Sequence, residues 1–434
     1  MSAPTSDSNA PSAALPAREE RVLLTTLAAV QFTHILDFMI MMPLGSQLMR
    51  AFGVSPTQFS WLVAAYGLSA AVTGFAAGFV LDRFDRKTAL LALYAGFVVA
   101  TLSCALAPTF WALLVARLAA GACGGVAGSV VTAMVGDVIP PERRGRAMGT
   151  VMAAFPLASV VGVPLGISLA TWFEWHAPFF MLAGVSVITW FVASRALPAV
   201  RIARSTNSPW RQMREIVTHP VHRRAFAVAG VLVFAGGLII PFMAPTMVAN
   251  VGLTEKQLPL IYFFGGVCTF FTMPYMGRLA DRHDKLHVLA SISVLSVIGV
   301  LALTNLPALP LPIVLVVTTL FFVGMSGRFA PTMAMVTNAV DARYRGGFMS
   351  VASSMQQAAA GLANLTVGAL VTADAATGRI EGYPRAGLLA VGAFGTTVWL
   401  AYRLKQIAPY AARNPAPPSA EPSGDALPAP PAGR

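Results

Sequence analysis

The sequence predicts an all-α membrane protein with twelve transmembrane helices in two six-helix, pseudo-symmetric halves. Its 434 residues are 56% hydrophobic and only 11% charged, with a mean hydropathy of +0.68. This is more apolar surface than one soluble core can bury. The apolar residues form runs of roughly 18 to 25, the length at which a helix crosses a bilayer with its backbone hydrogen bonds satisfied. Sequence features also recur at an offset of 199 to 201 residues, which indicates a duplicated unit.

The apolar runs divide the chain into two domains of six helices, 22–197 and 225–404, joined by a basic cytoplasmic linker at 198–224. Residues 1–21 and the Pro/Ala-rich residues 405–434 are predicted to be disordered cytoplasmic ends. No basic segment with a cleavage site precedes the first run, so we expect no removable signal peptide. The predicted spans are 22–46, 58–81, 88–107, 109–137, 147–172, 178–197, 225–249, 257–280, 286–305, 311–338, 347–372 and 384–404.

The distribution of basic residues predicts the orientation. With a cytoplasmic N-terminus, 24 of the 30 Lys and Arg fall on the cytoplasmic side, four on the opposite side and two within spans. The positive-inside rule therefore places both termini in the cytoplasm and accounts for the net charge of +12 without a nucleic-acid partner. The three cysteines all lie within spans, at spacings that indicate neither a disulfide framework nor a metal site.

Two charged loops repeat. The stretch GFVLDRFDRK (78–87) is echoed by GRLADRHDK (277–285), and DVIPPERRGRAMG (137–149) by DARYRGGFMS (341–350). Halves related in this way suit a molecule that binds a ligand between them near the middle of the membrane and tilts to expose it to either side.

These motifs resemble those of the major facilitator superfamily. GFVLDRFDRK is similar to its loop 2–3 signature, LVARLAAGACGG (114–125) to its fourth-helix signature, and SVVGVPLG (159–166) to the fifth-helix motif that marks antiporters, here with Gly162, Pro164 and Gly166. With HILDFMIMMPLG (34–45) in the first span, the chain looks most like the bacterial drug and arabinose-type efflux branch.

The chain departs from the family pattern in places. Ala120 replaces the usual Gln of the fourth-helix signature, and the fifth-helix motif lacks an adjacent Gly-Pro pair. Asp85 and Asp284 stand where the family has a loop glycine, and we expect them to adopt the left-handed turn, which Asp tolerates better than most residues.

The resemblance implies that the repeated loops form a gate. Asp82 and Asp281 end helices 2 and 8, where an acid can face the positive N-terminus of a helix across the seam between the halves. A purely topogenic pair of basic loops is the alternative. The predicted gating residues are Gly78, Asp82, Arg83, Arg86, Lys87, Gly277, Asp281 and Arg282.

Asp37 is the only one of 18 acidic residues that lies well within a span. A lone acid there costs several kcal/mol, so it requires a partner in the bundle interior. Asp37 lies roughly 13 Å from the outer end of helix 1 and Arg117 roughly 12 Å from that of helix 4, and the resemblance makes these helices neighbours. We expect a proton-coupling pair, with a permanent structural ion pair as the alternative.

His34, one helical turn from Asp37, is predicted to share the proton or to donate to the substrate, although packing is the commoner role of a buried histidine. Gln31 extends this polar stripe and is a candidate for substrate binding. Other candidates for substrate binding lie in the second half: Arg328, for a gate or an anionic group, and the amides Gln356, Gln357 and Asn364, which could equally join helices. Pro156 and Pro164 should bend helix 5, and Gly-xxx-Gly pairs should allow close helix contacts.

The sequence therefore predicts a secondary active transporter, most simply a proton-coupled antiporter that exports small organic molecules (drugs, sugars or metabolites) across the bacterial inner membrane. A proton-coupled uptake symporter and a non-transporting sensor are the alternatives. No HExxH, GxSxG, Walker or paired-acid motif indicates an enzyme or an ATP-driven pump. We expect a monomer in the bilayer whose partners are its substrate and protons, with no metal or other cofactor.

Overall fold

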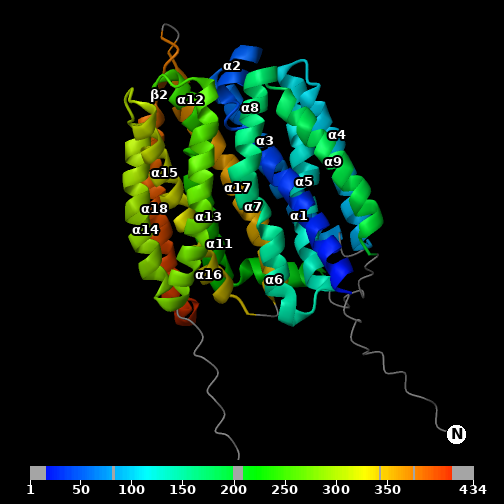
Figure 1. Cartoon of the computed structure of the whole chain (residues 1–434). Helices are drawn as coiled ribbons and strands as arrows, with labels where there is room; N and C mark the ends of the chain where they lie inside the picture. The colour runs from blue at the N-terminus through cyan, green and yellow to red at the C-terminus, as the bar shows by residue number, and fades with distance from the viewer. Residues whose placement is uncertain (1–15, 81–83, 199–208, 342–343, 375–376, 413–434) are drawn as a thin grey trace, which may run out of the picture.

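The computed structural model describes residues 16–80, 84–198, 209–341, 344–374 and 377–412. Its long helices run roughly parallel and form two lobes, the N-terminal one on the right of Figure 1 and the C-terminal one on the left. We call the end of the bundle that holds Ala17 and Ala412 the terminal end, and the opposite end, which carries a short hairpin, the hairpin end.

Nine helices and a π-helical turn make up the described part of the N-terminal lobe. They are α1 (Ala17–Ile40), α2 (Gly45–Phe52), α3 (Pro56–Val80), α4 (Arg86–Ala105), α5 (Phe110–Val138), α6 (Pro141–Met152), α7 (Ala154–Leu157), the π-helical η2 (Ala158–Gly162), α8 (Val163–Phe173) and α9 (Ala177–Ala196).

After the linker helix α10 (Pro209–Thr218), the C-terminal lobe repeats this plan. Its strands β1 (Thr372–Ala373) and β2 (Ile380–Glu381) pair antiparallel, with Thr372 opposite Glu381, an element that the sequence did not predict. Its helices are α11 (Pro220–Gly237), α12 (Ile240–Ala249), η3 (Glu255–Gln257), α13 (Leu258–Arg282), α14 (Lys285–Thr304), α15 (Leu311–Gly327), α16 (Phe329–Asn338), α17 (Arg345–Leu370), α18 (Tyr383–Ile407) and η5 (Pro409–Ala411).

Eleven of the predicted spans meet the length and hydropathy expected of membrane helices within the described residues. The exception is α17, which has 26 residues, enough to span a bilayer, but contains Gln356, Gln357 and Asn364. It packs along α3 of the other lobe, so one of its faces is buried in protein rather than exposed to lipid. The chain is therefore a multi-pass helical membrane protein, with eleven spans satisfying the criteria and α17 as the expected twelfth.

Proline explains where helices 1, 5, 7 and 10 break. A proline cannot donate a backbone hydrogen bond and its ring clashes with the carbonyl four residues earlier, so a helix tends to end near that residue. For this reason helix 1, predicted to continue to residue 46, ends at Ile40 and resumes as α2. In each case a helix ends close to the residue that lies four positions before a proline. The helix ends and their prolines are Ile40 with Pro43, Met152 with Pro156, Gly237 with Pro241 and Gly327 with Pro331.

Part of each end that the sequence predicts to be disordered is folded. Residues 17–21 belong to α1, where Glu19 and Glu20 favour the first helical turn and the Glu20 carboxylate lies 2.8 Å from Arg143 of α6. Residues 405–412 are also folded, with Ala408, Ala411 and Ala412 buried in the C-terminal lobe. Residues 1–15 and 413–434 lie outside the described residues.

An ion pair fastens the end of α18 to the start of α14. Lys405 Nζ donates to Asp284 at 2.6 Å, and the backbone N–H of Lys285 donates to the carbonyl of Ala412 at 3.2 Å. Partial burial raises the pKa of Asp284, but Lys405 and the backbone N–H groups of Leu286 and His287 outweigh it and hold the pKa below its usual value.

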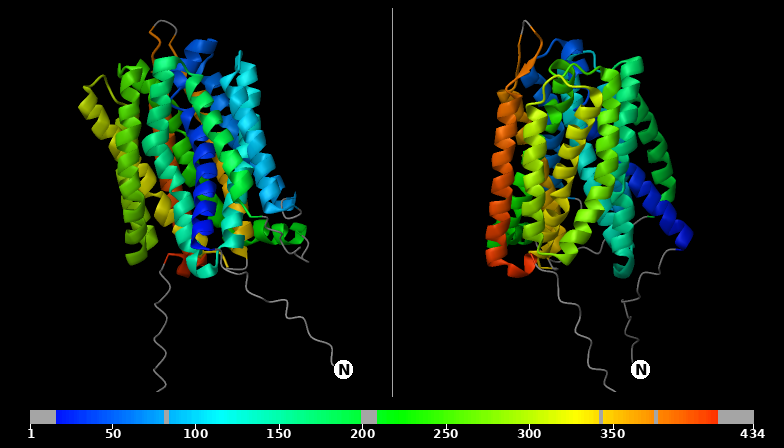
Figure 2. Two further views of the ribbon diagram at one scale, coloured as in Figure 1. Left: turned by 45° about the vertical axis from the view of Figure 1, so that its right-hand side comes forward. Right: turned by 60° about the vertical axis from the view of Figure 1, so that its left-hand side comes forward.

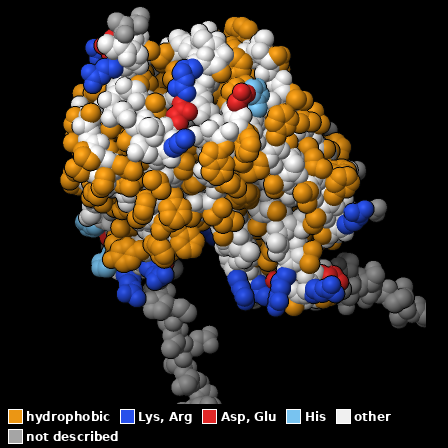
Figure 3. Space-filling model, turned by 45° about the horizontal axis from the view of Figure 1, so that its top comes forward, with side chains coloured by type: hydrophobic (Ala, Val, Ile, Leu, Met, Phe, Trp, Pro, Cys, Tyr) orange, Lys and Arg blue, Asp and Glu red, His pale blue; other side chains and the backbone are white. Residues whose placement is uncertain are grey.

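The lobes are joined at the hairpin end. Glu255 of η3 accepts from Gln47 at 2.9 Å and pairs with Arg50, both on α2. Thr57 of α3 donates to the carbonyl of Gly368 of α17 at 2.8 Å. In the space-filling view the lobes are parted along the lower edge, at the terminal end, where Lys and Arg side chains gather below an apolar band (Figure 3). The structure is therefore closed at the hairpin end and open at the terminal end.

The linker helix α10 lies across the terminal end (Figure 2, left) and touches both lobes. Trp210 stacks on Phe79 of α3 with 4.4 Å between ring centroids. Glu215 accepts a hydrogen bond of 3.1 Å from Tyr344, next to α17, and Ile216 is buried. The predicted linker at 198–224 thus contains a helix that bridges the lobes, while residues 199–208 lie outside the described chain.

Glu255→Gln should shift the protein away from the state closed at the hairpin end, because the variant loses the charge that pairs with Arg50. A solvent-exposed pair contributes about 0.2 to 1 kcal/mol, so we expect the fraction open at this end to rise about one-and-a-half- to fivefold. Distances between spin labels at the exposed positions 51 and 256, in a cysteine-free background, measure this fraction. Glu174→Gln is the matched control, because Glu174 is a largely exposed acid at the same end. An equal response in both variants would contradict the role of Glu255 in closing the hairpin end.

Candidate functional site

A completely buried ion pair joins α1 and α5 in the N-terminal lobe. Arg117 donates to the Asp37 carboxylate at 2.6 Å and to its backbone carbonyl at 3.2 Å, and neither side chain is exposed. The second carboxylate oxygen of Asp37 and two guanidinium nitrogens of Arg117 have no partner among the described residues. The structure thus brings together the two residues that depth in the membrane predicted to meet, in a pair whose hydrogen bonds are incompletely satisfied.

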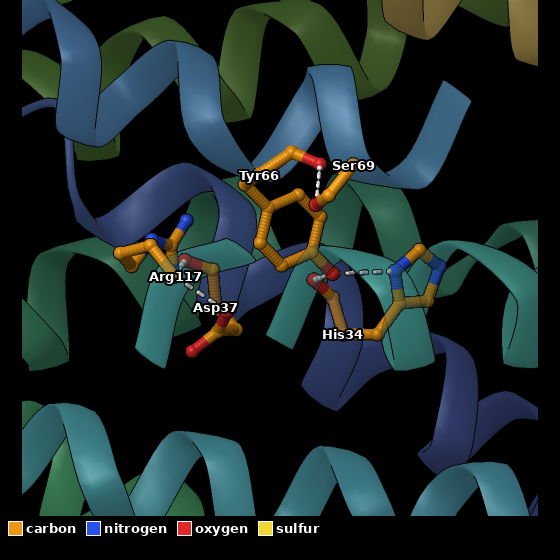
Figure 4. Close-up of polar contacts among 5 residues, drawn as sticks. All are labelled: His34, Asp37, Tyr66, Ser69 and Arg117. Atoms are coloured by element: carbon orange, nitrogen blue, oxygen red, sulfur yellow. Dashed lines mark hydrogen bonds and ion pairs between the residues drawn. The ribbon is translucent and has the colours of Figure 1, made fainter. Parts of the chain in front are cut away.

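Tyr66 of α3 connects this pair to His34. Figure 4 shows its ring between Arg117 and Asp37 on one side and His34 on the other. The Arg117 guanidinium lies 4.7 Å from the ring centroid, a cation–π distance. The Tyr66 hydroxyl lies 3.3 Å from His34 Nδ1 and donates to the His34 carbonyl, also at 3.3 Å. The polar groups form one continuous cluster, because a single aromatic side chain contacts both the ion pair and the histidine.

Glycines of α5 make room for this cluster. A Cβ at Gly121 would lie 2.3 Å from the Tyr66 carbonyl oxygen, and one at Gly124 would lie 2.5 Å from the Tyr66 hydroxyl. A Cβ at Gly128 would lie 2.7 Å from His34 Nε2. Distances below 3 Å are not tolerated, so α3 and α1 approach α5 this closely only because these positions lack side chains.

The cluster continues toward the terminal end. Gln31 lies one turn before His34 on α1, and Gln31 Oε1 and His34 Nε2 both lie beside Gly128. Neither atom has a hydrogen-bond partner among the described residues. Gln31 and His34 are 8% and 9% exposed, whereas Asp37 is fully buried, so polar groups extend from the buried carboxylate to the edge of the accessible surface.

The fifth-helix motif packs against the same helix as the ion pair. A Cβ at Gly162 would lie 2.9 Å from Leu36, and one at Gly166 would lie 2.4 Å from Ile40, both on α1. Pro164 begins α8 after the π-helical turn η2. The prolines thus coincide with irregular turns in helix 5, as predicted, and the motif glycines hold that helix close to Asp37.

The predicted gating residues are spread over the terminal end. Arg86 donates to Asp137 at 3.0 Å within the N-terminal lobe, Lys87 is half-buried, and Gly78 lies against Met213 of α10. Gly277 has open space around its Cα, and Asp281 and Arg282 are exposed. Asp82 and Arg83 lie outside the described residues. The lobes are parted at this end. A latch between them therefore stays a prediction, for the conformation in which the terminal end is closed.

The left-handed turns expected at Asp85 and Asp284 are absent. Their φ values are −59° and −61°, and each residue instead caps the helix that follows. Asp85 accepts from the backbone N–H of Thr88 at 3.0 Å, and Asp284 from that of Leu286 at 2.9 Å. An N-cap uses the side-chain oxygen that glycine lacks, so Asp serves these loops in an extended conformation.

The substrate-binding candidates of the C-terminal lobe do not join the cluster around Asp37. Gln356 and Gln357 are half-buried on α17, where the Gln357 carbonyl approaches Gly67 of α3. Asn364 is fully buried on α17, and both of its amide atoms lack partners among the described residues. Arg328 lies between α15 and α16 and is 1% exposed.

The sequence did not single out Tyr66 or Glu255. Tyr66 lies in an apolar run of the sequence. The only feature that could have marked it as a functional residue is its hydroxyl, on a helix that packs against the glycines of α5. Glu255 lies just before a predicted span, between Thr254 and Gln257, whose capping box marks an ordered turn. No group of three or more His, Cys, Asp or Glu suited to a metal occurs among the described residues.

Two helical lobes built on one plan, parted at one end and carrying a buried ion pair, define a membrane transporter of the two-half type. The family model of the Major Facilitator Superfamily matches residues 27–364 and again residues 225–430. The chain belongs to the Major Facilitator Superfamily.

The chain shares limited sequence identity with individual proteins of the family. The chain is 27% identical to the MFS-type transporter YceJ of Bacillus subtilis over 82% of its own length and 90% of that protein. It is 28% identical to a chloramphenicol resistance protein of Streptomyces lividans, over 58% of this chain and 64% of that one. Among solved structures, a bacterial homologue of the human lysosomal transporter Spinster superposes with a TM-score of 0.66 over 93% of this chain and 100% of that one, at 14% identity.

Gly121→Ala should destabilise the protein, because its Cβ would collide with the backbone of Tyr66, which cannot move aside, as well as with the Ser69 hydroxyl. We expect a cost of about 1 to 3 kcal/mol, typical of overpacking in a close-packed interior. Gly136→Ala, on the same helix with nothing within 4 Å, should be neutral or stabilising because alanine is the better helix former. Thermal unfolding of the two purified variants tests this, and equal melting temperatures would refute the close packing.

Proposed function

We propose that this protein is a proton-coupled antiporter that exports small organic molecules across the bacterial inner membrane, with Asp37 as the proton carrier. The observation that carries the proposal is the fully buried Asp37–Arg117 pair, in which Asp37 Oδ1 and two Arg117 nitrogens have no partner among the described residues. An ion pair with a purely structural role is most stable when all its polar atoms are hydrogen-bonded. A pair that titrates must instead allow one partner to lose its charge while the lobe stays folded.

The coupling follows from charge balance. Arginine stays protonated, so the net charge of the pair is zero when Asp37 is ionised and +1 when Asp37 carries a proton. In low dielectric these states differ strongly in energy, and a change in solvation during alternating access shifts the balance between them. A proton taken up from outside is then released inside when a substrate enters between the lobes.

The route for that proton uses the polar cluster. His34 and Gln31 extend from the ion pair toward the terminal end, where the lobes are parted. Tyr66 couples His34 to the pair through its hydroxyl and its ring. With the terminal end in the cytoplasm, as the basic loops predict, the cluster provides cytoplasmic access to Asp37.

The relatives support the exporting direction. The similarity to a chloramphenicol resistance protein fits the outward movement of a small organic drug, and the glycines of the fifth-helix motif pack on the helix that carries Asp37. In the gate, Asp82 and Asp281 would hold the terminal end shut once the lobes tilt.

Substrate-induced proton release from the detergent-purified protein tests the coupling. Chloramphenicol, a cationic dye and arabinose are added in turn to a weakly buffered solution that contains a pH indicator. An antiporter releases protons on binding its substrate, and linkage requires substrate affinity to fall up to tenfold per pH unit on the acid side. Asp37→Asn should abolish both the release and this pH dependence, while Glu174→Gln, an exposed acid, should retain them.

Undiminished proton release in Asp37→Asn would rule out Asp37 as the carrier. Proton uptake on binding, in place of release, would favour a symporter. Asp37→Glu, which keeps the acid, serves as the folded reference should Asp37→Asn be too unstable to purify.

A further inference from the structure

Arg328 lies where helix 10 is broken. Pro331 deprives the carbonyl of Gly327 of its helical partner, so α15 ends at Gly327 and α16 begins at Phe329. Thr332 donates both its hydroxyl, at 2.7 Å, and its backbone N–H, at 3.4 Å, to the Arg328 carbonyl. Arg328 is 1% exposed, so the break places a guanidinium inside the C-terminal lobe.

Within the described chain this guanidinium has no carboxylate partner. Its NH2 donates to Met325 Sδ at 3.3 Å, and its central carbon lies 3.7 Å from the centroid of the Phe394 ring. Nε and NH1 have no hydrogen-bond partner among the described residues. Sulfur and a ring face are weak substitutes for a counter-charge, so the site lacks one negative group.

Arg117, the buried arginine of the other half, differs from Arg328 in having a negatively charged partner. Both arginines are almost completely buried, both contact an aromatic ring, and they belong to helices 4 and 10, which occupy equivalent places in the two halves. Arg117 has Asp37 at 2.6 Å. Within the described chain Arg328 has no such residue, so its counter-charge must come from elsewhere.

A second group without partners approaches the same part of the lobe. Asn364 of α17 is fully buried, and both of its amide atoms lack a partner in the described part of the chain. Its Oδ1 would lie 3.5 Å from a Cβ at Gly237 of α11, while the methyl of Met325, the neighbour of Arg328, would lie 3.0 Å from a Cβ at Gly236. Met325, which the Arg328 guanidinium contacts, and Asn364 thus lie beside adjacent glycines of α11.

We propose that Arg328, assisted by Asn364, forms an anion-recognition site that takes the carboxylate of a small organic anion. A guanidinium pairs with the two oxygens of a carboxylate through parallel N–H groups, Arg328 has unused donors at Nε and NH1, and the Asn364 amide supplies a further donor. Phe394 and Met325 provide an apolar wall, which suits an aromatic or alkyl body. The proposal rests on the proposed transport function and names its substrate class as organic monoanions.

Ligand-dependent thermal unfolding of the full-length protein in detergent tests this site. The probes are sodium benzoate, sodium chloride at equal ionic strength, and benzamide, which has the same ring without the charge. We expect benzoate alone to raise the melting temperature, by about 3 °C or more near saturation. Arg328→Met should lose this shift and Arg328→Lys, which keeps the charge but not the fork, should reduce it.

Arg403→Met is the matched control, because Arg403 also lies over an aromatic ring, 5.7 Å from Trp399, but is exposed. It should retain the full benzoate response. Without any ligand, Arg328→Met should unfold at the same temperature as the wild type or higher, since it removes an unpaired buried charge.

Four outcomes would overturn the proposal: no benzoate shift, equal shifts with benzamide, equal shifts with chloride, or an Arg328→Met variant that melts well below the wild type without ligand. Chloride alone would identify an inorganic anion site, and a lower melting temperature would make Arg328 structural. The test needs no proton gradient, and it reads ligand binding at Arg328 rather than proton release from Asp37. Failure here is therefore distinguishable from failure of proton coupling.

Discussion

The requirement that a charge inside a bilayer be paired governs this structure. Asp37 and Arg117 neutralise each other across α1 and α5, and everything that brings those helices together serves that contact. The glycines of α5 admit Tyr66 and His34, and Gly162 and Gly166 bring helix 5 against α1. Removing either charge leaves the other buried and alone, which costs about 3 to 5 kcal/mol, so the pair both stabilises the lobe and makes it sensitive to a single proton.

Proline divides the helices next to this pair and next to Arg328. Pro43, Pro241 and Pro331 end α1, α11 and α15 and leave short second segments beyond each break. Segmented helices can tilt at their breaks without unwinding, and the contacts of Glu255 with α2 show that such a segment closes the hairpin end. The break after Ile40 thus lies between Asp37 and α2, the segment that closes the hairpin end, while Arg328 lies at the break of helix 10 itself.

The fold was largely predictable because long apolar runs and a repeat at one offset leave few alternatives. The Asp37–Arg117 pair was predictable for the same reason: a lone acid in a span needs a base at its depth. Tyr66 was not, because its role depends on which helix face meets the glycines of α5. Likewise the caps at Asp85 and Asp284 and the folded residues 405–412 depend on local contacts that composition does not encode.

The central claim is that Asp37 gains and loses a proton while Arg117 stays charged. Infrared difference spectroscopy of the purified protein between two pH values reads this directly, because a protonated carboxyl group absorbs apart from carboxylates and amides. The account predicts a carboxylic-acid band that appears on acidification, weakens when a transported substrate is added, and is missing in Asp37→Asn. A spectrum of Asp37→Asn identical to that of the wild type across the whole pH range would show that the pair never titrates and is a permanent structural bridge.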